Sequence, residues 1–181
     1  MKLFDSEQLG ILRGSAFAAG AAVTVVAAGY ALIPPEWFGL NAAMTTGDRI
    51  AFALKADLPL FIWLAWCVRA VSKTRFWSSV DRKGSAYGKP SSAIVVPLAI
   101  LQNSLEQTVL ALGAHLVLAT VLRGPELLII PLLVALYLVG RVAFLLKYSE
   151  GAAGRSFGMA LTAAPTVAAY LAAAGLMVAG R

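Results

Sequence analysis

Residues 93–148 read AIVVPLAILQNSLEQTVLALGAHLVLATVL (93–122), RGPE (123–126) and LLIIPLLVALYLVGRVAFLLKY (127–148). A bilayer has a hydrocarbon core about 30 Å thick, and a helix needs about 20 mostly apolar residues to cross it. Both long segments meet that requirement. Because the connection between them is so short, they are expected to form an antiparallel hairpin. The segment therefore predicts two consecutive membrane-spanning helices.

Three more apolar runs of membrane-spanning length flank this hairpin. Gly14–Ile33 carries no charge and is followed by two prolines, and Ser156–Gly180 carries no charge and is rich in Ala and Gly. Ile50–Val71 is the weakest run because charged residues interrupt both its ends; Lys55 and Asp57 are expected to reach the outer headgroups. The fold predicted is an all-α, polytopic membrane bundle of five helices.

The composition excludes several other classes of protein. The chain is 60% hydrophobic and only 13% charged, whereas soluble domains carry about a quarter charged residues. It is also too apolar for a disordered chain. Since Lys and Arg can set membrane orientation, the net charge of +6 requires no nucleic-acid partner, and none is expected. One cysteine, Cys67, excludes an intrachain disulfide, and no Cys/His cluster has metal-site spacing, so no metal is expected.

The basic residues predict the orientation of the spans. The segment 72–92 holds five cations against one acid, as is typical of a cytoplasmic loop. Threading five spans from that loop puts the N-terminus in the cytoplasm and the C-terminus outside. Ala-rich composition and the lack of targeting signals favour a bacterial inner (cell) membrane. Eleven of the 15 basic residues then lie on or toward the inner side: Lys2, Arg13, Arg69, Lys73, Arg75, Arg82, Lys83, Lys89, Arg141, Lys147 and Arg155.

The third span carries a polar group at membrane depth. Glu106 follows Gln102 by four residues and Asn103 by three, so the three can share one helix face. Because an ionisable residue in the bilayer costs about 2.5–3.5 kcal/mol on insertion scales, it marks a functional candidate. The alternative is a polar seam that joins helices by hydrogen bonds. His115, on the opposite face, is expected to be a packing residue.

The fourth span carries a matching polar stripe. Arg141, Phe144 and Tyr148 are spaced i, i+3 and i+7, and Arg155 follows just before the expected start of the last helix. A cation there strengthens the positive end of the helix dipole and favours a thiolate. The alternative for Arg155 is simple anchoring at the inner surface. Arg141 lies too deep for anchoring, so Glu106 on the adjacent helix is expected to be its partner.

The motifs in these two spans, taken in order, resemble those of the MAPEG family, the membrane-associated proteins of eicosanoid and glutathione metabolism. Asn103-Ser104-Leu105-Glu106 resembles the family's N-x-x-E element. Arg141-x-x-Phe144-x-x-x-Tyr148 with the later Arg155 resembles the R-x-x-Y-x-x-x-Y element and later Arg of the glutathione-using members.

The resemblance covers about residues 58–180 and implies a homotrimer with active sites between neighbouring protomers, open to the lipid and facing the cytoplasm. Residues 1–49 would then add a helix and an outer loop to a four-helix MAPEG-like domain over residues 50–181. The resemblance implies glutathione as co-substrate, with Arg155 stabilising its thiolate. The residues implied to hold glutathione are Asn103, Glu106, Arg141, Tyr148, Gln102, Arg69, Lys73 and Arg75.

The function expected is that of a glutathione-dependent transferase or peroxidase acting on lipophilic electrophiles at the cytoplasmic side, with membrane lipids as further partners. Three positions depart from the glutathione-using pattern: Ala99 replaces an Arg, and Gln107 and Phe144 replace Tyr. These departures favour the alternative of a non-catalytic lipid-binding or scaffolding trimer. A transporter using Glu106 and Arg141 is a third class, but no inverted repeat or pair of broken helices supports it.

Overall fold

The computed structural model describes residues 4–181, so Lys2, counted above with the inner-side cations, lies outside the described part. Within that part the chain is helical and contains no strand. Five segments are long and apolar enough to cross a membrane, which confirms the predicted all-α membrane bundle. The main helices are α1 (Ser6–Leu32), α2 (Thr46–Ala56), α3 (Leu58–Trp77), α4 (Ser92–Val121), α5 (Ile129–Leu146) and α6 (Gly151–Val178).

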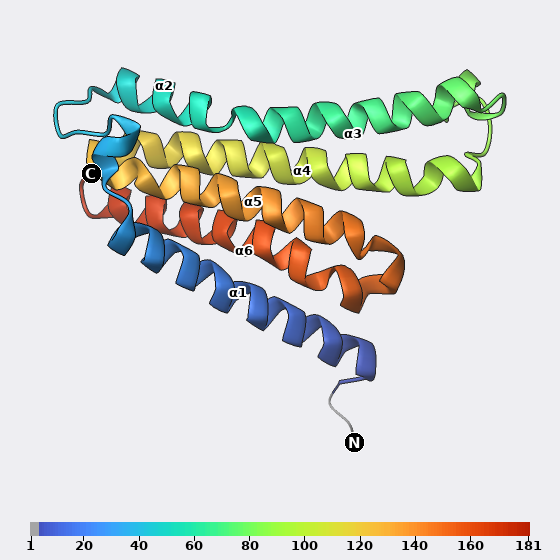
Figure 1. The fold of residues 1–181 in the computed structure, drawn as a ribbon, viewed down its shortest axis with the longest axis horizontal. Helices are drawn as coiled ribbons and strands as arrows, with labels where there is room; N and C mark the ends of the chain where they lie inside the picture. Colours follow the sequence, from blue (N-terminus) through green and yellow to red (C-terminus); the bar gives the residue numbers. More distant parts are fainter. Residues whose placement is uncertain (1–3) are drawn as a thin grey trace.

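Successive spans alternate in direction along one long axis, so that α1, α4 and α6 run one way and α2, α3 and α5 run the other (Figure 1). Helix α4 lies between α3 on one side and α6 on the other, and α1 packs mainly on α6. We call the end that carries the 78–91 connection and the α5–α6 connection the basic end. The opposite end carries the 33–45 connection and the C-terminus (Figure 1). Helices α4 and α5 form the predicted antiparallel hairpin.

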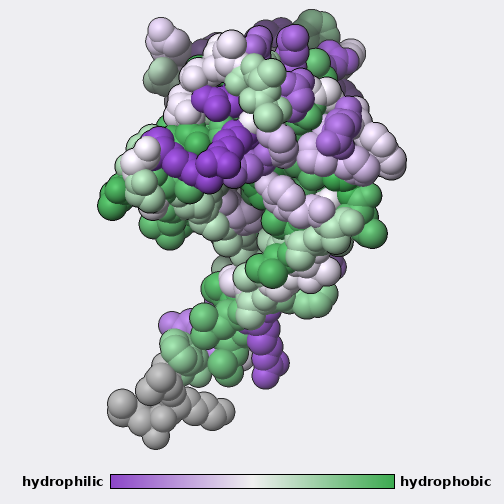
Figure 2. Space-filling model, turned by 90° about the vertical axis from the view of Figure 1, so that its left-hand side faces the viewer, coloured by the Kyte–Doolittle hydropathy of each residue, from purple (hydrophilic) through white to green (hydrophobic). Residues whose placement is uncertain are grey.

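The outward surface suits a bilayer. Figure 2 looks onto the end opposite the basic end, where hydrophilic residues gather, while much of the surface of the projecting helix α1 in the lower part of the view is hydrophobic. Large apolar side chains stay exposed on the outer faces of the spans; examples are Phe17, Ile62, Val109, Leu146 and Leu171. Such a surface is expected where lipid rather than water is the solvent. The chain is therefore an integral, multi-pass membrane protein.

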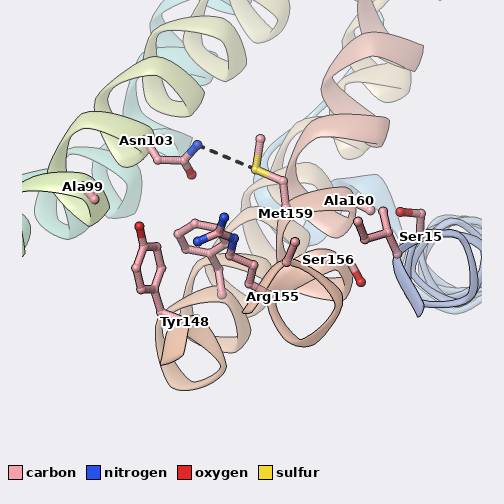
Figure 3. Close-up of a pocket in the computed structure, with 11 residues that line it drawn as sticks. Ser15, Ala99, Asn103, Tyr148, Arg155, Ser156, Met159 and Ala160 are labelled. Carbon is pink, nitrogen blue, oxygen red and sulfur yellow. Dashed lines mark hydrogen bonds between the residues drawn. The ribbon is translucent and has the colours of Figure 1, made fainter. Parts of the chain in front are cut away.

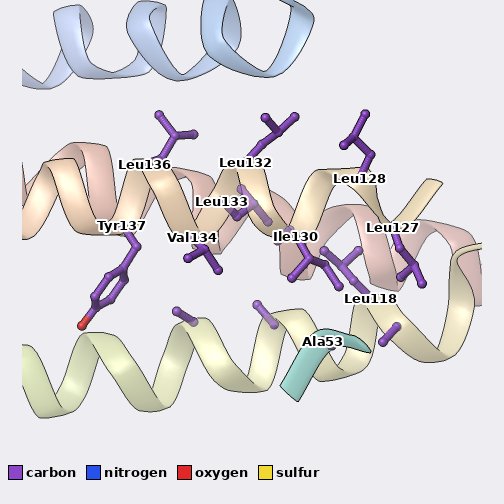
Figure 4. Close-up of a cluster of buried hydrophobic side chains, with 14 of the residues drawn as sticks. Ala53, Leu118, Leu127, Leu128, Ile130, Leu132, Leu133, Val134, Leu136 and Tyr137 are labelled. Carbon is purple, nitrogen blue, oxygen red and sulfur yellow. The ribbon is translucent and has the colours of Figure 1, made fainter. Parts of the chain in front are cut away.

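The core is built around α5, between α4 and α6 (Figure 4). Leu127, Leu128 and Ile130 are fully buried there. Helices α5 and α6 approach closely because glycines face each other: a Cβ on Gly140 would lie 2.9 Å from the carbonyl oxygen of Gly158. This agrees with the expectation that the last span packs against protein. The close approach sets the position of Arg155 relative to the end of α5.

The first span begins earlier than predicted. Helix α1 starts at Ser6 rather than Gly14 because Asp5 caps it: the Asp5 carboxylate accepts from the Gln8 backbone N–H at 2.8 Å. Arg13 lies exposed inside the helix. One cation near the membrane surface does not end a helix, because helix formation depends on the backbone and its caps.

The second span is divided at Asp57, which separates α2 from α3. The expectation that Asp57 reaches the outer headgroups is wrong. It is fully buried, and its Oδ1 lies 2.6 Å from Nδ1 of His115 on α4. Pro59 at the start of α3 favours a new helix at this point, and the break turns Asp57 toward the bundle. His115 is a packing residue, as expected, with Asp57 as its partner.

Candidate functional site

A cavity of about 450 Å³ opens at the basic end of the bundle. Helix α6 forms its floor, with α4 and the end of α5 on one side and α1 on the other (Figure 3). It brings together three of the predicted residues from three parts of the chain: Asn103, Tyr148 and Arg155. The other lining residues are Ile11, Ser15, Ala99, Phe144, Ala152, Ser156, Met159 and Ala160.

Arg155 supplies the positive charge of this cavity. Its guanidinium carbon lies 4.9 Å from the centre of the Tyr148 ring, a cation–π arrangement that keeps the charge beside the cavity. Among residues 4–181, Arg155 forms no ion pair with a carboxylate. Because α6 begins at Gly151, Arg155 lies one turn inside the helix rather than just before it, which corrects the predicted position. A cation without an acidic partner can meet an anionic ligand.

Arg141 lies beneath the cavity and is fully buried. Its Nε donates to Thr162 Oγ1 at 3.1 Å, and one terminal nitrogen donates to Asn103 Oδ1 at 2.6 Å. The guanidinium stacks 4.7 Å from the centre of the Phe144 ring. Arg141 thereby fixes the Asn103 side chain, which points from α4 toward Met159 (Figure 3). It acts as a buried support for the cavity wall.

Glu106 does not pair with Arg141, so that expectation is wrong. Glu106 and Gln102 lie exposed on another face of α4, where Gln102 Nε2 donates to Glu106 Oε1 at 2.8 Å. Three residues along a helix turn the side-chain direction by about 60°, which is enough to point Asn103 inward and Glu106 outward. The N-x-x-E element is thus divided between the cavity and the outer surface of α4.

Comparison with known proteins identifies the family of the chain. The sequence model of the MAPEG family matches residues 50–175, more than half of the chain. The chain belongs to the MAPEG family. Searches of curated proteins and of solved structures gave no match. The matched region runs from α2 into α6 and holds both motifs, whereas α1 is additional to it.

Two further predicted cations of this MAPEG protein, Arg69 and Lys73, lie exposed on α3 beside a second cavity of about 530 Å³. Trp66 and Trp77 line the same cavity. Helix α4 separates it from the first cavity, and the two share no lining residue. Arg75 turns elsewhere and donates to Ser85 Oγ at 3.5 Å. Within one chain, the α3 cations and Arg155 are therefore not brought together.

Several lining residues were missed from the sequence. Ile11 and Ser15 come from α1, and Ser156 and Met159 come from α6 beside Arg155. A signal existed for Met159, which follows Arg155 by one helical turn and so shares its face. The sequence of α1 does not predict which face of the MAPEG domain it packs against.

The start of α4 is fixed by a polar cluster in the 78–91 connection. The Asp81 carboxylate accepts hydrogen bonds from Ser78 Oγ at 2.6 Å, from the Ser91 backbone N–H at 2.8 Å and from Ser91 Oγ at 2.6 Å. These hydrogen bonds lower the pKa of Asp81, and the one from Ser78 Oγ has the largest effect. Since Ser91 is the residue directly before α4, the cluster holds the start of the helix that carries Ala99 and Asn103.

Proposed function

We propose that this MAPEG protein is a glutathione-dependent transferase or peroxidase that acts on lipophilic electrophiles at the membrane. The observation that carries the proposal is the convergence on one cavity of Asn103, Tyr148 and Arg155, an arginine that has no acidic partner within residues 4–181. Glutathione carries two carboxylates, an amine and a thiol. A cation, a phenol and an amide therefore suit parts of its polar surface.

Arg155 is the residue proposed to activate the thiol. A nearby guanidinium favours the thiolate over the thiol, and the thiolate is the nucleophile. When bound, glutathione would lose its thiol proton to water and supply the sulfur that bonds to the electrophilic carbon of the second substrate. A leaving group then departs with its electron pair or, in an alkenal, the carbon next to the carbonyl takes up a proton. Arg155 holds the negative charge until that bond forms. Tyr148, whose ring lies against Arg155, keeps the guanidinium in place and offers a hydroxyl.

The proposal includes a homotrimer with sites between protomers. Its support is the separation of cations within one chain: Arg69 and Lys73 lie across α4 from Arg155. A second copy that packs beside α4 would bring such α3 cations toward the first copy's cavity. In this arrangement Arg69, Lys73 and Arg75 would meet the glutathione carboxylates, with Glu106 and Gln102 facing the neighbouring copy.

In the proposed orientation the basic end faces the cytoplasm, the N-terminus lies inside and the C-terminus lies outside. The bias of eleven inner cations to four outer ones supports this orientation. The membrane proposed is the inner membrane of a bacterium. A site open along the helices would receive the second substrate from the lipid rather than from water.

A non-catalytic lipid-binding or scaffolding trimer is the second candidate, and a specific observation favours it. Ala99, which replaces an arginine of the glutathione-using pattern, lines the cavity directly. Phe144 adds an apolar ring where that pattern has a phenol. Each missing charge-assisted hydrogen bond removes about 1.5–3 kcal/mol of stabilisation, which lowers the affinity for glutathione relative to lipid.

Conjugation of glutathione to a chlorodinitrobenzene by the purified protein tests the proposal. Arg155→Ala is expected to lower kcat/KM at least tenfold. Lys147→Ala is the matched control because Lys147 lies at the same end, pairs with Glu150 at 2.6 Å and does not line the cavity. Equal activity of the wild type and Arg155→Ala would contradict the mechanism. Absence of both conjugation and thermal stabilisation by glutathione would favour the second candidate.

A further inference from the structure

The cavity is built partly from a helix that the MAPEG match does not include. The match covers residues 50–175, yet Ile11 and Ser15 of α1 line the same cavity as Arg155. Figure 3 shows Ser15 facing Ala160 across one side of α6, while Arg155 and Tyr148 lie on the other side. The compartment is therefore bounded by the family's helices on one side and by α1 on the other.

The position of α1 is set by close packing rather than by loose contact. Small residues recur every four positions along its buried edge, at Gly10, Gly14, Ala18 and Ala22, a spacing that lets membrane helices approach closely. A Cβ on Gly10 would lie 2.7 Å from the Cβ of Ala153, and one on Gly14 would overlap the Ser156 side chain. The α1 wall therefore has a defined place.

The chemistry of the cavity divides between its two sides. Arg155, Tyr148 and Asn103 lie away from α1, whereas Ile11 and Ser15 of α1 line the other side near Ala160 (Figure 3). An amphipathic ligand would place its charged part at Arg155 and its hydrocarbon part along α1.

We propose that α1 forms the wall against which the alkyl part of the lipophilic substrate lies, and that Ile11 and Ser15 set the alkyl length accepted. This inference rests on the proposed function for the identity of the reaction, but the wall itself is a property of the cavity. Ile11 and Ser15 are specificity-determining residues in this account. They take no part in activating the thiol.

The test uses the full-length protein in detergent and a series of hydroxyalkenals that share one reactive group and differ in chain length. Ile11→Trp fills the α1 side, so kcat/KM for the longest alkenal is expected to fall at least about tenfold. The value for the shortest alkenal and the KM for glutathione should change less than about twofold. Leu12→Trp is the matched control, since Leu12 is the next residue and is exposed away from the cavity.

Equal chain-length profiles for Ile11→Trp and Leu12→Trp would overturn the inference while leaving the proposed function intact. If the wild type conjugates neither a chlorodinitrobenzene nor any alkenal, the proposed function fails, and the role of α1 is then tested by binding alone. A long-chain alkyl diazirine should label the peptide containing Met159 in the wild type and in Leu12→Trp, and label it far less in Ile11→Trp. Equal labelling of that peptide in all three proteins would overturn the inference.

Discussion

Helix α4 carries two buried polar clusters, and they differ in what surrounds them. Toward the basic end, Asn103 accepts from the buried Arg141, and a cavity opens beside the pair. Toward the opposite end, His115 pairs with the buried Asp57 at 2.6 Å, and neither residue lines that cavity. One cluster supports an open compartment, and the other lies within packed helices.

The difference shows that a buried ionisable residue in a membrane helix does not by itself mark a functional site. Asp57 and His115 join the α2–α3 break to α4, which is a structural role. Arg141 has a structural role too, but the residue it fixes lines the cavity that also holds Arg155, which has no acidic partner in the described part of the chain. Proximity to such a cavity, rather than burial, separates the two clusters.

The largest expected effect is that of Arg141→Ala. The change leaves Asn103 Oδ1 without its donor and opens a void beside Phe144, so the free energy of unfolding should fall by about 3–5 kcal/mol. Denaturant titration in detergent micelles measures this loss. Arg141→Lys keeps the charge but not the forked hydrogen bonds or the stacking, and should lose less. A loss below about 1 kcal/mol for Arg141→Ala would remove the support role.

Mutation of the Asp57–His115 pair should lower stability without changing the cavity. His115→Ala removes the partner of Asp57 and should lower the free energy of unfolding by about 1.5–3 kcal/mol. Replacing both residues by leucine should recover part of that loss. The thermal shift produced by glutathione is expected to stay at the wild-type value in these variants. A thermal shift smaller than that of the wild type would contradict this and show that the two clusters are coupled.

A smaller effect is expected from acid. The pKa of Asp81 is lowered in the folded protein, so its stabilising contribution is present above the carboxyl's unfolded pKa of about 3.9 and is lost as pH falls through the lower folded value. In Asp81→Asn, the thermal midpoint should depend less on pH below about 4 than it does in the wild type. Identical pH profiles would exclude a role for this carboxylate in holding α4.

The smallest effect on stability is expected for Arg155→Ala. Its main contact is the stacking on Tyr148, which is worth about 0.5–1 kcal/mol when partly exposed. The free energy of unfolding should therefore fall by no more than about 1 kcal/mol, even though the activity falls at least tenfold. Denaturant titration alongside Arg141→Ala gives the comparison. A loss as large as that of Arg141→Ala would make Arg155 a structural residue.

The spans could be predicted from the sequence because run length and apolar content measure what a bilayer requires. Asn103, Tyr148 and Arg155 were found because their spacing resembles family motifs. The partner of Arg141 was not found, since helical spacing shows which residues share a face but not which face meets the next helix. Asp57 was misplaced for a similar reason: its partner, His115, is 58 residues away in sequence, and no local pattern joins them.

The contribution of α1 to the cavity could not be predicted for a different reason. A helix that packs closely is indicated by the four-residue spacing of Gly10, Gly14, Ala18 and Ala22. The spacing does not show which surface that helix packs against. That surface is the face of α6 that carries Ala153 and Ser156. The predicted start at Gly14 also removed Ile11 from the span. Together these explain why one side of the cavity was missed.

The central claim, that the cavity holds glutathione with its thiol ionised by Arg155, is tested most directly by ultraviolet difference spectroscopy of the thiolate. Glutathione is mixed with the detergent-solubilised protein at a pH well below the usual thiol pKa of about 8.5. The account predicts a thiolate band for the wild type and for Lys147→Ala, and its loss in Arg155→Ala. No band in the wild type, or an unchanged band in Arg155→Ala, would contradict the claim.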